Sequence, residues 1–112
     1  MESLLDVRPL LGVVALSVLL GAPAARAEAP NISIKEYAFS PAQLTVAAGT
    51  QVTWTNHDQV PHTIVEEGKK FHSPALDTND SYSFVLTQPG TYRYFCSLHP
   101  QMVGTITVVK GG

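Results

Sequence analysis

The sequence predicts an all-β sandwich of about seven to eight short strands. Three observations support this prediction. Short runs rich in β-branched and aromatic residues follow one another after residue 27. Clusters of Gly, Pro, Asn and Asp separate these runs and are typical of turns. Finally, no stretch of ten residues in this part of the chain shows helical periodicity, so a helical fold is disfavoured.

Three strands are predicted between residues 30 and 56. The segment Ala-Ala-Gly-Thr at 47–50 separates the second run from the third and predicts a hairpin turn, with Gly49 free to adopt a positive φ. The first run has a kink before its last apolar residue. The apolar residues that mark the three strands are Ile32, Ile34 and Phe39, then Leu44 and Val46, then Val52 and Trp54.

Four further strands are predicted in the second half of the chain. A short one at 63–65 follows His62, and the segment 66–80 is the least regular part. Because side chains alternate along a strand, Tyr92, Tyr94 and Cys96 share one face, which we expect to be buried. We expect His99 and Met102 to lie in the loop that follows. The remaining strands are marked by Tyr82, Phe84 and Leu86, and by Ile106 and Val108.

The N-terminal segment is predicted to be a secretory signal peptide. Its apolar run, 10–20, is too short to span a bilayer as a helix, and the small-x-small pattern Ala25-Arg26-Ala27 follows it. We expect cleavage after Ala27, which removes 1–27 and leaves 28–112 as one domain. The mature protein is then expected to be a periplasmic monomer without stable membrane association. An uncleaved membrane anchor is the alternative.

The charge of the chain argues against nucleic acid as a partner. Seven Lys and Arg residues stand against nine Asp and Glu residues, so the formal net charge is −2. No basic stripe is present, and binding to nucleic acid or to an anionic membrane needs one.

The single cysteine, Cys96, lies in a Cys-x-x-His-x-x-Met run with His99 and Met102. One cysteine cannot form an internal disulfide, and a free thiol is exposed to oxidation outside the cytoplasm. Ligation of a metal would protect it. A thiolate, an imidazole and a thioether, joined by a second imidazole, make the trigonal site with a weak axial Met that selects copper.

His62 is the favoured second imidazole because Pro61 precedes it and a predicted strand follows it. The other two histidines, His57 and His72, are expected to lie exposed on the surface. The other candidates also have purely structural interpretations: Cys96 could be an inert buried thiol, and Met102 could be a core residue.

These residues resemble those of the cupredoxins, the small blue-copper proteins, and most closely their amicyanin-like members. The two-residue spacings on either side of His99 are the most specific part. The resemblance implies a Greek-key β-sandwich that holds one type 1 copper through His62, Cys96, His99 and Met102. It also implies that Asn56 ties its loop to the cysteine-bearing segment; the alternative is an ordinary turn residue. The other matching segments are 39–41, 49–54, 60–62, 71–73 and 89–92.

The resemblance further implies electron transfer, not enzymatic catalysis. Copper would cycle between Cu(II) and Cu(I), and a redox protein, such as a dehydrogenase or a c-type cytochrome, would donate or accept the electron. Electrons would leave through His99, inside an apolar docking patch that includes Val60, Pro61, Leu98, Pro100 and Met102.

Three other functions compete with the electron carrier. A periplasmic protein that stores or delivers copper is the strongest rival, although the chain lacks Met-rich or His-rich tracts. A structural zinc site would not use a thioether. A Cys-His nucleophilic pair would leave Met102 without a role.

Overall fold

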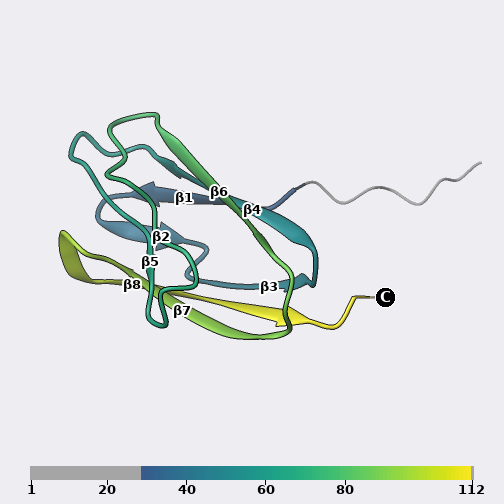
Figure 1. The fold of residues 1–112 in the computed structure, drawn as a ribbon. Helices are drawn as coiled ribbons and strands as arrows, with labels where there is room; N and C mark the ends of the chain where they lie inside the picture. Colours follow the sequence, from purple (N-terminus) through teal and green to yellow (C-terminus); the bar gives the residue numbers. More distant parts are fainter. Residues whose placement is uncertain (1–28, 112) are drawn as a thin grey trace, which may run out of the picture.

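The computed structural model of the chain describes residues 29–111 and contains two four-stranded sheets packed face to face (Figure 1). The predicted signal peptide, 1–27, lies outside the described residues. No helix able to cross a membrane occurs among residues 29–111. The strands are β1 (Asn31–Lys35), β2 (Ala38–Ser40), β3 (Gln43–Ala47), β4 (Thr50–Asn56), β5 (Val65–Glu66), β6 (Ser81–Leu86), β7 (Gly90–Cys96) and β8 (His99–Val109).

The two sheets have the strand orders β2-β1-β4-β6 and β3-β8-β7-β5. The pairs β1–β4 and β3–β8 are parallel, and the other neighbouring strands are antiparallel. This arrangement confirms the predicted all-β sandwich.

The space between the sheets is filled by alternate residues of each strand, as the period-two patterns predict. Trp54 of β4 and Tyr94 of β7 meet across it, with their ring centroids 5.5 Å apart and their planes at 85°. Phe39 packs on the other side of Tyr94 at 4.8 Å. Such edge-to-face contacts add to the stabilisation from apolar burial. Tyr82 and Phe84 are only partly buried at the margin of this core.

The prediction of a hairpin at 47–50 was wrong. Gly49 does have a positive φ of 94°, but β3 and β4 belong to different sheets, so the turn crosses from one layer to the other. The Ala48 N–H donates to the carbonyl of Val109 at 2.8 Å, and the Gly49 N–H donates to that of Leu86 at 2.7 Å. The same turn residues suit a hairpin and a crossover, and the long-range pairing of β3 with β8 decides between them.

The loop expected after Cys96 is also shorter than predicted. Only Ser97 and Leu98 form the turn, and β8 begins at His99, so both His99 and Met102 lie on a strand. Cys96 pairs with His99 after an irregularity between Phe95 and Cys96. The tight hairpin therefore brings Cys96 and His99 together through backbone pairing.

Candidate metal centre

His62 is fixed by backbone pairing outside the main strands. It forms an isolated antiparallel bridge with Leu76, in which the His62 N–H donates at 3.1 Å and the Leu76 N–H donates back at 2.8 Å. Its side chain is fully buried. The imidazole is therefore held in place from both its backbone and its surroundings.

The structure brings His62, Cys96 and His99 together at one end of the sandwich, with one donor atom from each residue within 4.8 Å of the others. Nδ1 of His62 lies 3.7 Å from the Cys96 Sγ, and Nδ1 of His99 lies 3.6 Å from it. Zinc binds thiolate at about 2.3 Å and imidazole at about 2.0 Å, so donors that share an ion of this kind in a plane lie roughly 3–4 Å apart. The spacing of the three donors fits a single metal ion.

Met102 lies on β8, three residues beyond His99, and its side chain is 2% exposed. We expected Met102 to belong to the apolar docking patch around His99, and this was wrong, because a side chain this enclosed cannot be part of an exposed patch. Pro61, Leu98 and Pro100 are exposed, Leu98 at 51%. His99 is half-buried while His62 is fully buried, so His99 is the imidazole nearer to solvent.

The Cys96 sulfur accepts hydrogen bonds from Thr63, a residue outside the predicted ligand set. The Thr63 N–H lies 3.4 Å from Sγ and its hydroxyl lies 3.8 Å away. The same hydroxyl accepts the Ser97 N–H at 2.8 Å. Donors to sulfur stabilise the thiolate. Thr63 directly follows the candidate ligand His62 in the sequence, and this position could have indicated its role.

Asn56 is buried, but it does not make the contacts that the resemblance implied. Its Nδ2 donates to the carbonyls of Val60 at 2.9 Å and Leu76 at 2.8 Å, and its Oδ1 accepts the Asp58 N–H at 2.8 Å. Within the described residues, Thr63 makes the side-chain link to the cysteine-bearing segment. Asn56 instead braces the loop that leads to His62 against the segment around Leu76.

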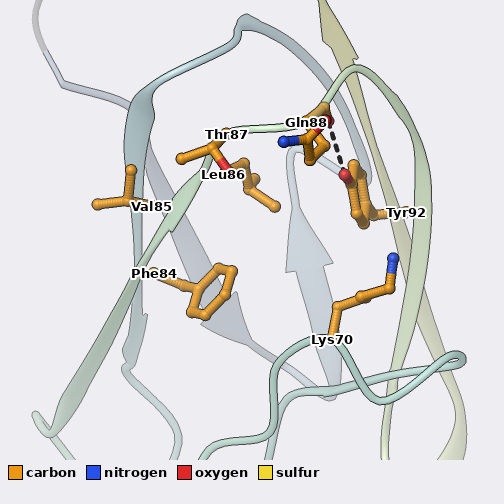
Figure 2. Close-up of a pocket in the computed structure, with 7 residues that line it drawn as sticks. All are labelled: Lys70, Phe84, Val85, Leu86, Thr87, Gln88 and Tyr92. Carbon is orange, nitrogen blue, oxygen red and sulfur yellow. Dashed lines mark hydrogen bonds between the residues drawn. The ribbon is translucent and has the colours of Figure 1, made fainter.

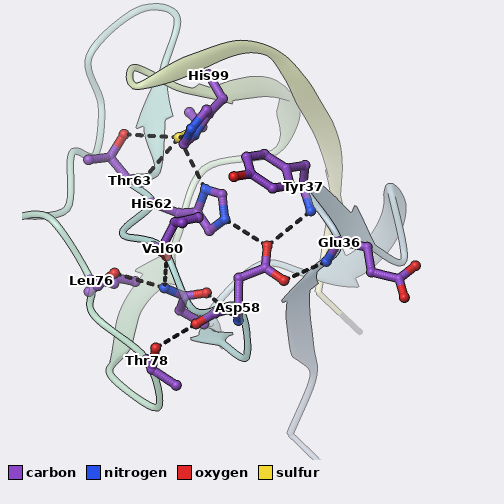
Figure 3. Close-up of polar contacts among 11 residues, drawn as sticks. Glu36, Tyr37, Asp58, Val60, His62, Thr63, Leu76, Thr78 and His99 are labelled. Carbon is purple, nitrogen blue, oxygen red and sulfur yellow. Dashed lines mark hydrogen bonds and ion pairs between the residues drawn. The ribbon is translucent and has the colours of Figure 1, made fainter.

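Asp58 is the polar partner of His62. One of its carboxylate oxygens lies 2.8 Å from the His62 Nε2 (Figure 3). Because a carboxylate can only accept, this contact places the ring proton on Nε2 and leaves the Nδ1 lone pair free for a metal. Burial opposes ionisation of Asp58, but hydrogen bonds from the Tyr37 N–H and from His62 outweigh it and hold the pKa of this carboxyl below its ordinary value.

The other two histidines are exposed, as predicted, and neither belongs to the cluster. A surface hollow of about 120 Å³ lies elsewhere, bordered by Lys70, Tyr92 and the segment 84–88 (Figure 2). Within it the Tyr92 hydroxyl donates to the Gln88 carbonyl at 2.6 Å. None of the candidate ligands lines this hollow.

The chain belongs to the cupredoxin family: residues 10–108 match the Cupredoxin-like domain. With this membership, the arrangement of His62, Cys96, His99 and Met102 is suited to binding one type 1 copper.

Individual relatives agree with this assignment. The chain is 35% identical over 99 residues to amicyanin-alpha of Methylorubrum extorquens, a match that covers 84% of this chain and 81% of the relative. It superposes on a purple cupredoxin from Nitrosopumilus maritimus with a TM-score of 0.67 and 39% identity, covering 71% of this chain and 99% of that one. A copper-containing nitrite reductase from Thermus scotoductus matches with a TM-score of 0.71 and 28% identity. That match covers 82% of this chain but only 25% of the reductase.

Proposed function

We propose that this chain is an exported electron carrier that holds one type 1 copper through His62, Cys96, His99 and Met102. The observation that carries the proposal is the convergence of two imidazole Nδ1 atoms on one buried thiol, at 3.7 and 3.6 Å. Bound copper would supply a single electron by cycling between Cu(II) and Cu(I). Residues 1–27 would act as the signal peptide, and residues 28–112 would form the working domain in the periplasm.

The residues around the site suit electron transfer because they keep the donor atoms where they are. His62 is held by the bridge to Leu76, and Cys96 and His99 are held by the β7–β8 pairing. Hydrogen bonds from Thr63 stabilise the Cys96 thiolate. A site that moves little between its oxidation states keeps the reorganisation small.

We further infer that the electron leaves through His99, beside the exposed Pro61, Leu98 and Pro100. A small apolar face of this kind fits the transient docking of a redox protein, such as a dehydrogenase or a c-type cytochrome. With a net charge of −2, electrostatic steering of that partner would be modest. We propose no catalytic role. The match to the copper-containing nitrite reductase covers only 25% of the length of the reductase.

A visible spectrum tests the proposal. The protein expressed from Glu28 and loaded with Cu(II) is expected to show an intense thiolate-to-copper band that bleaches on reduction. Cys96→Ala is expected to lack the band, whereas His72→Ala, which removes an exposed histidine outside the cluster, should keep it. A colourless copper complex that passes its metal to an apo-acceptor would overturn the proposal in favour of copper delivery.

A further inference from the structure

One carboxylate, that of Asp58, connects two parts of the chain at the metal centre. Oδ1 accepts the Glu36 N–H at 2.6 Å, and Oδ2 accepts the Tyr37 N–H at 3.0 Å. Oδ2 also lies 2.8 Å from the His62 Nε2. Asp58 therefore links the turn between β1 and β2 to a candidate metal ligand (Figure 3).

The turn that Asp58 holds has an unusual backbone. Glu36 and Tyr37 both have positive φ angles, 54° and 59°. Residues other than Gly adopt this left-handed conformation at a cost, and two in succession persist only where the surroundings hold them. Hydrogen bonds from both N–H groups to a single carboxylate supply that constraint.

The strained turn places the Tyr37 ring against both imidazoles. Its centroid lies 5.4 Å from that of His62 and 4.9 Å from that of His99, and it meets each ring nearly at right angles, at 88° and 87°. The ring centroids of the two imidazoles lie 4.9 Å apart. Figure 3 shows the Tyr37 ring extending from the turn towards the two histidines. Tyr37 is still 48% exposed, so one side of it contacts the site and the other faces solvent.

We propose that Tyr37 covers the metal centre against small ligands from solution, and that Asp58 is the positioning residue that holds this cover together with His62. The inference rests on the proposed function. A copper ion with three strong donors and a weak axial one can accept a further anion if the anion can reach it. A ring packed on both imidazoles closes that approach, while electrons still pass through His99. The cover would thus favour electron transfer over the binding of a small substrate.

Azide titrations of the Cu(II)-loaded protein, followed by the thiolate-to-copper band, test the cover. We expect the wild-type protein and Tyr37→Phe to show little change, because both keep the ring. Tyr37→Ala should bind azide about tenfold or more tightly, with a saturable shift of the band. Tyr37→Ser repeats the truncation in case the Ala variant does not retain copper. Val85→Ala, which trims another exposed apolar side chain, should behave as the wild type.

The role of Asp58 is tested by coupling its substitution to that of Tyr37. Asp58→Asn should also open the site to azide, because an amide cannot accept from His62 and both turn N–H groups as a carboxylate does. Glu67→Gln removes the same charge at an exposed position and should change nothing. If Asp58 acts by placing Tyr37, the double variant should bind azide as Tyr37→Ala does.

The outcomes separate this inference from the proposed function. A wild-type protein without the blue band would remove the proposed function itself. A blue wild type whose azide response is unchanged in both Tyr37→Ala and Tyr37→Ser would overturn the cover alone. Strictly additive effects of Asp58→Asn and Tyr37→Ala would overturn the positioning role of Asp58.

Discussion

At the scale of single residues, the metal centre depends on polar contacts that set the state of its donor atoms. Asp58 determines which nitrogen of His62 carries the proton, and Thr63 donates to the Cys96 sulfur. Neither residue has a donor atom in the cluster itself. Residues that contact the ligands without binding the metal orient those ligands and adjust the redox potential. Substitution of Asp58 or Thr63 should therefore change the properties of the bound copper without removing it.

Thr63→Val should lower the reduction potential of the copper centre. Valine keeps the shape and the backbone N–H, but it removes the hydroxyl that lies 3.8 Å from the Cys96 sulfur and accepts the Ser97 N–H. With less hydrogen bonding, the thiolate donates more charge to Cu(II) and so favours the oxidised state. Loss of the part-buried hydrogen bond from the Ser97 N–H should also cost about 1 kcal/mol in the free energy of unfolding.

Voltammetry of the wild type and of Thr63→Val measures this change in reduction potential. Thr63→Ser is the matched control because it retains a hydroxyl. An unchanged or higher potential in Thr63→Val would contradict the expectation.

At the scale of elements, the β7–β8 hairpin supports the site and also closes the core beneath it. Tyr94 of β7 lies directly opposite Gly104 of β8. A Cβ built on Gly104 would meet the Tyr94 ring and hydroxyl at 2.3 Å, which is far inside contact distance. The glycine therefore makes room for the aromatic ring, which in turn packs on Trp54. Space, not backbone conformation, explains the glycine here.

Gly104→Ala should destabilise the protein by about 1–3 kcal/mol, because the added methyl group overpacks a filled core. Urea denaturation measures the change in the free energy of unfolding. Gly111→Ala is the control, since a Cβ there makes only ordinary contact at 3.5 Å. In a Tyr94→Ala background the cost of Gly104→Ala should largely disappear, and a full cost there would show that the clash lies elsewhere.

The Tyr94 hydroxyl should make the protein sensitive to alkali. Burial raises the pKa of Tyr94 to about 12 from an ordinary 10.0. The Trp54 N–H lies close enough to offset this slightly, although neither polar atom reaches hydrogen-bonding geometry within the described residues. Because the raised pKa belongs to the folded state, its contribution to stability is complete below pH 10 and is lost as the pH rises from about 10 to 12.

Denaturation at several alkaline pH values tests this expectation against Tyr94→Phe. Relative to the variant, the wild type should lose roughly 2–3 kcal/mol over that interval. Near pH 7 the variant should be about as stable as the wild type, because it removes a buried hydroxyl without a partner. Parallel pH profiles for the two proteins would contradict the assignment.

At the scale of the whole molecule, the donor groups come from two distant parts of the chain that the sandwich brings together. His62 follows β4, while Cys96 and His99 lie on the hairpin of β7 and β8. Hydrogen bonds hold each part in position within the protein alone. The fold should therefore form without metal, and copper should add stability to a structure that already exists.

Removal of copper by a chelator should lower the melting temperature while leaving the β-sheet signal of the protein intact. The folded structure is what brings the donors together, so the stabilisation by copper should grow with the logarithm of its free concentration. Thermal melts followed by circular dichroism measure this. Cys96→Ala should melt at nearly the same temperature with and without copper, and a chelated protein that resembles a random coil would contradict the expectation.

The sequence predicted most of the strands because these depend on local patterns. Cys96, His99 and Met102 could be selected for the same reason, since they lie within one short run, whereas His62 was joined to them by its place between Pro61 and a strand and by the family resemblance. Tyr92, Tyr94 and Cys96 occupy alternate positions along β7, and the burial of all three is confirmed. The crossover at Gly49 and the contacts of Asp58 with the turn at Glu36 and Tyr37 could not be predicted in the same way. They depend on partners about 20 residues or more away, such as Leu86 for the turn and Glu36 for the carboxylate. Local patterns do not specify which distant backbone group a carboxylate meets.

The parallel pairing of β3 with β8 has a consequence for the order of events in folding. Gln43–Ala47 aligns with Thr105–Val109, at the opposite end of β8 from His99. A high share of contacts this far apart in sequence makes folding slow. His62 and Cys96 are themselves 34 residues apart, so we expect the copper donors to meet only after the rate-limiting barrier. Bound copper should then slow unfolding and leave the refolding rate nearly unchanged. The metal would stabilise the native state kinetically, by slowing its unfolding, and would not nucleate its folding.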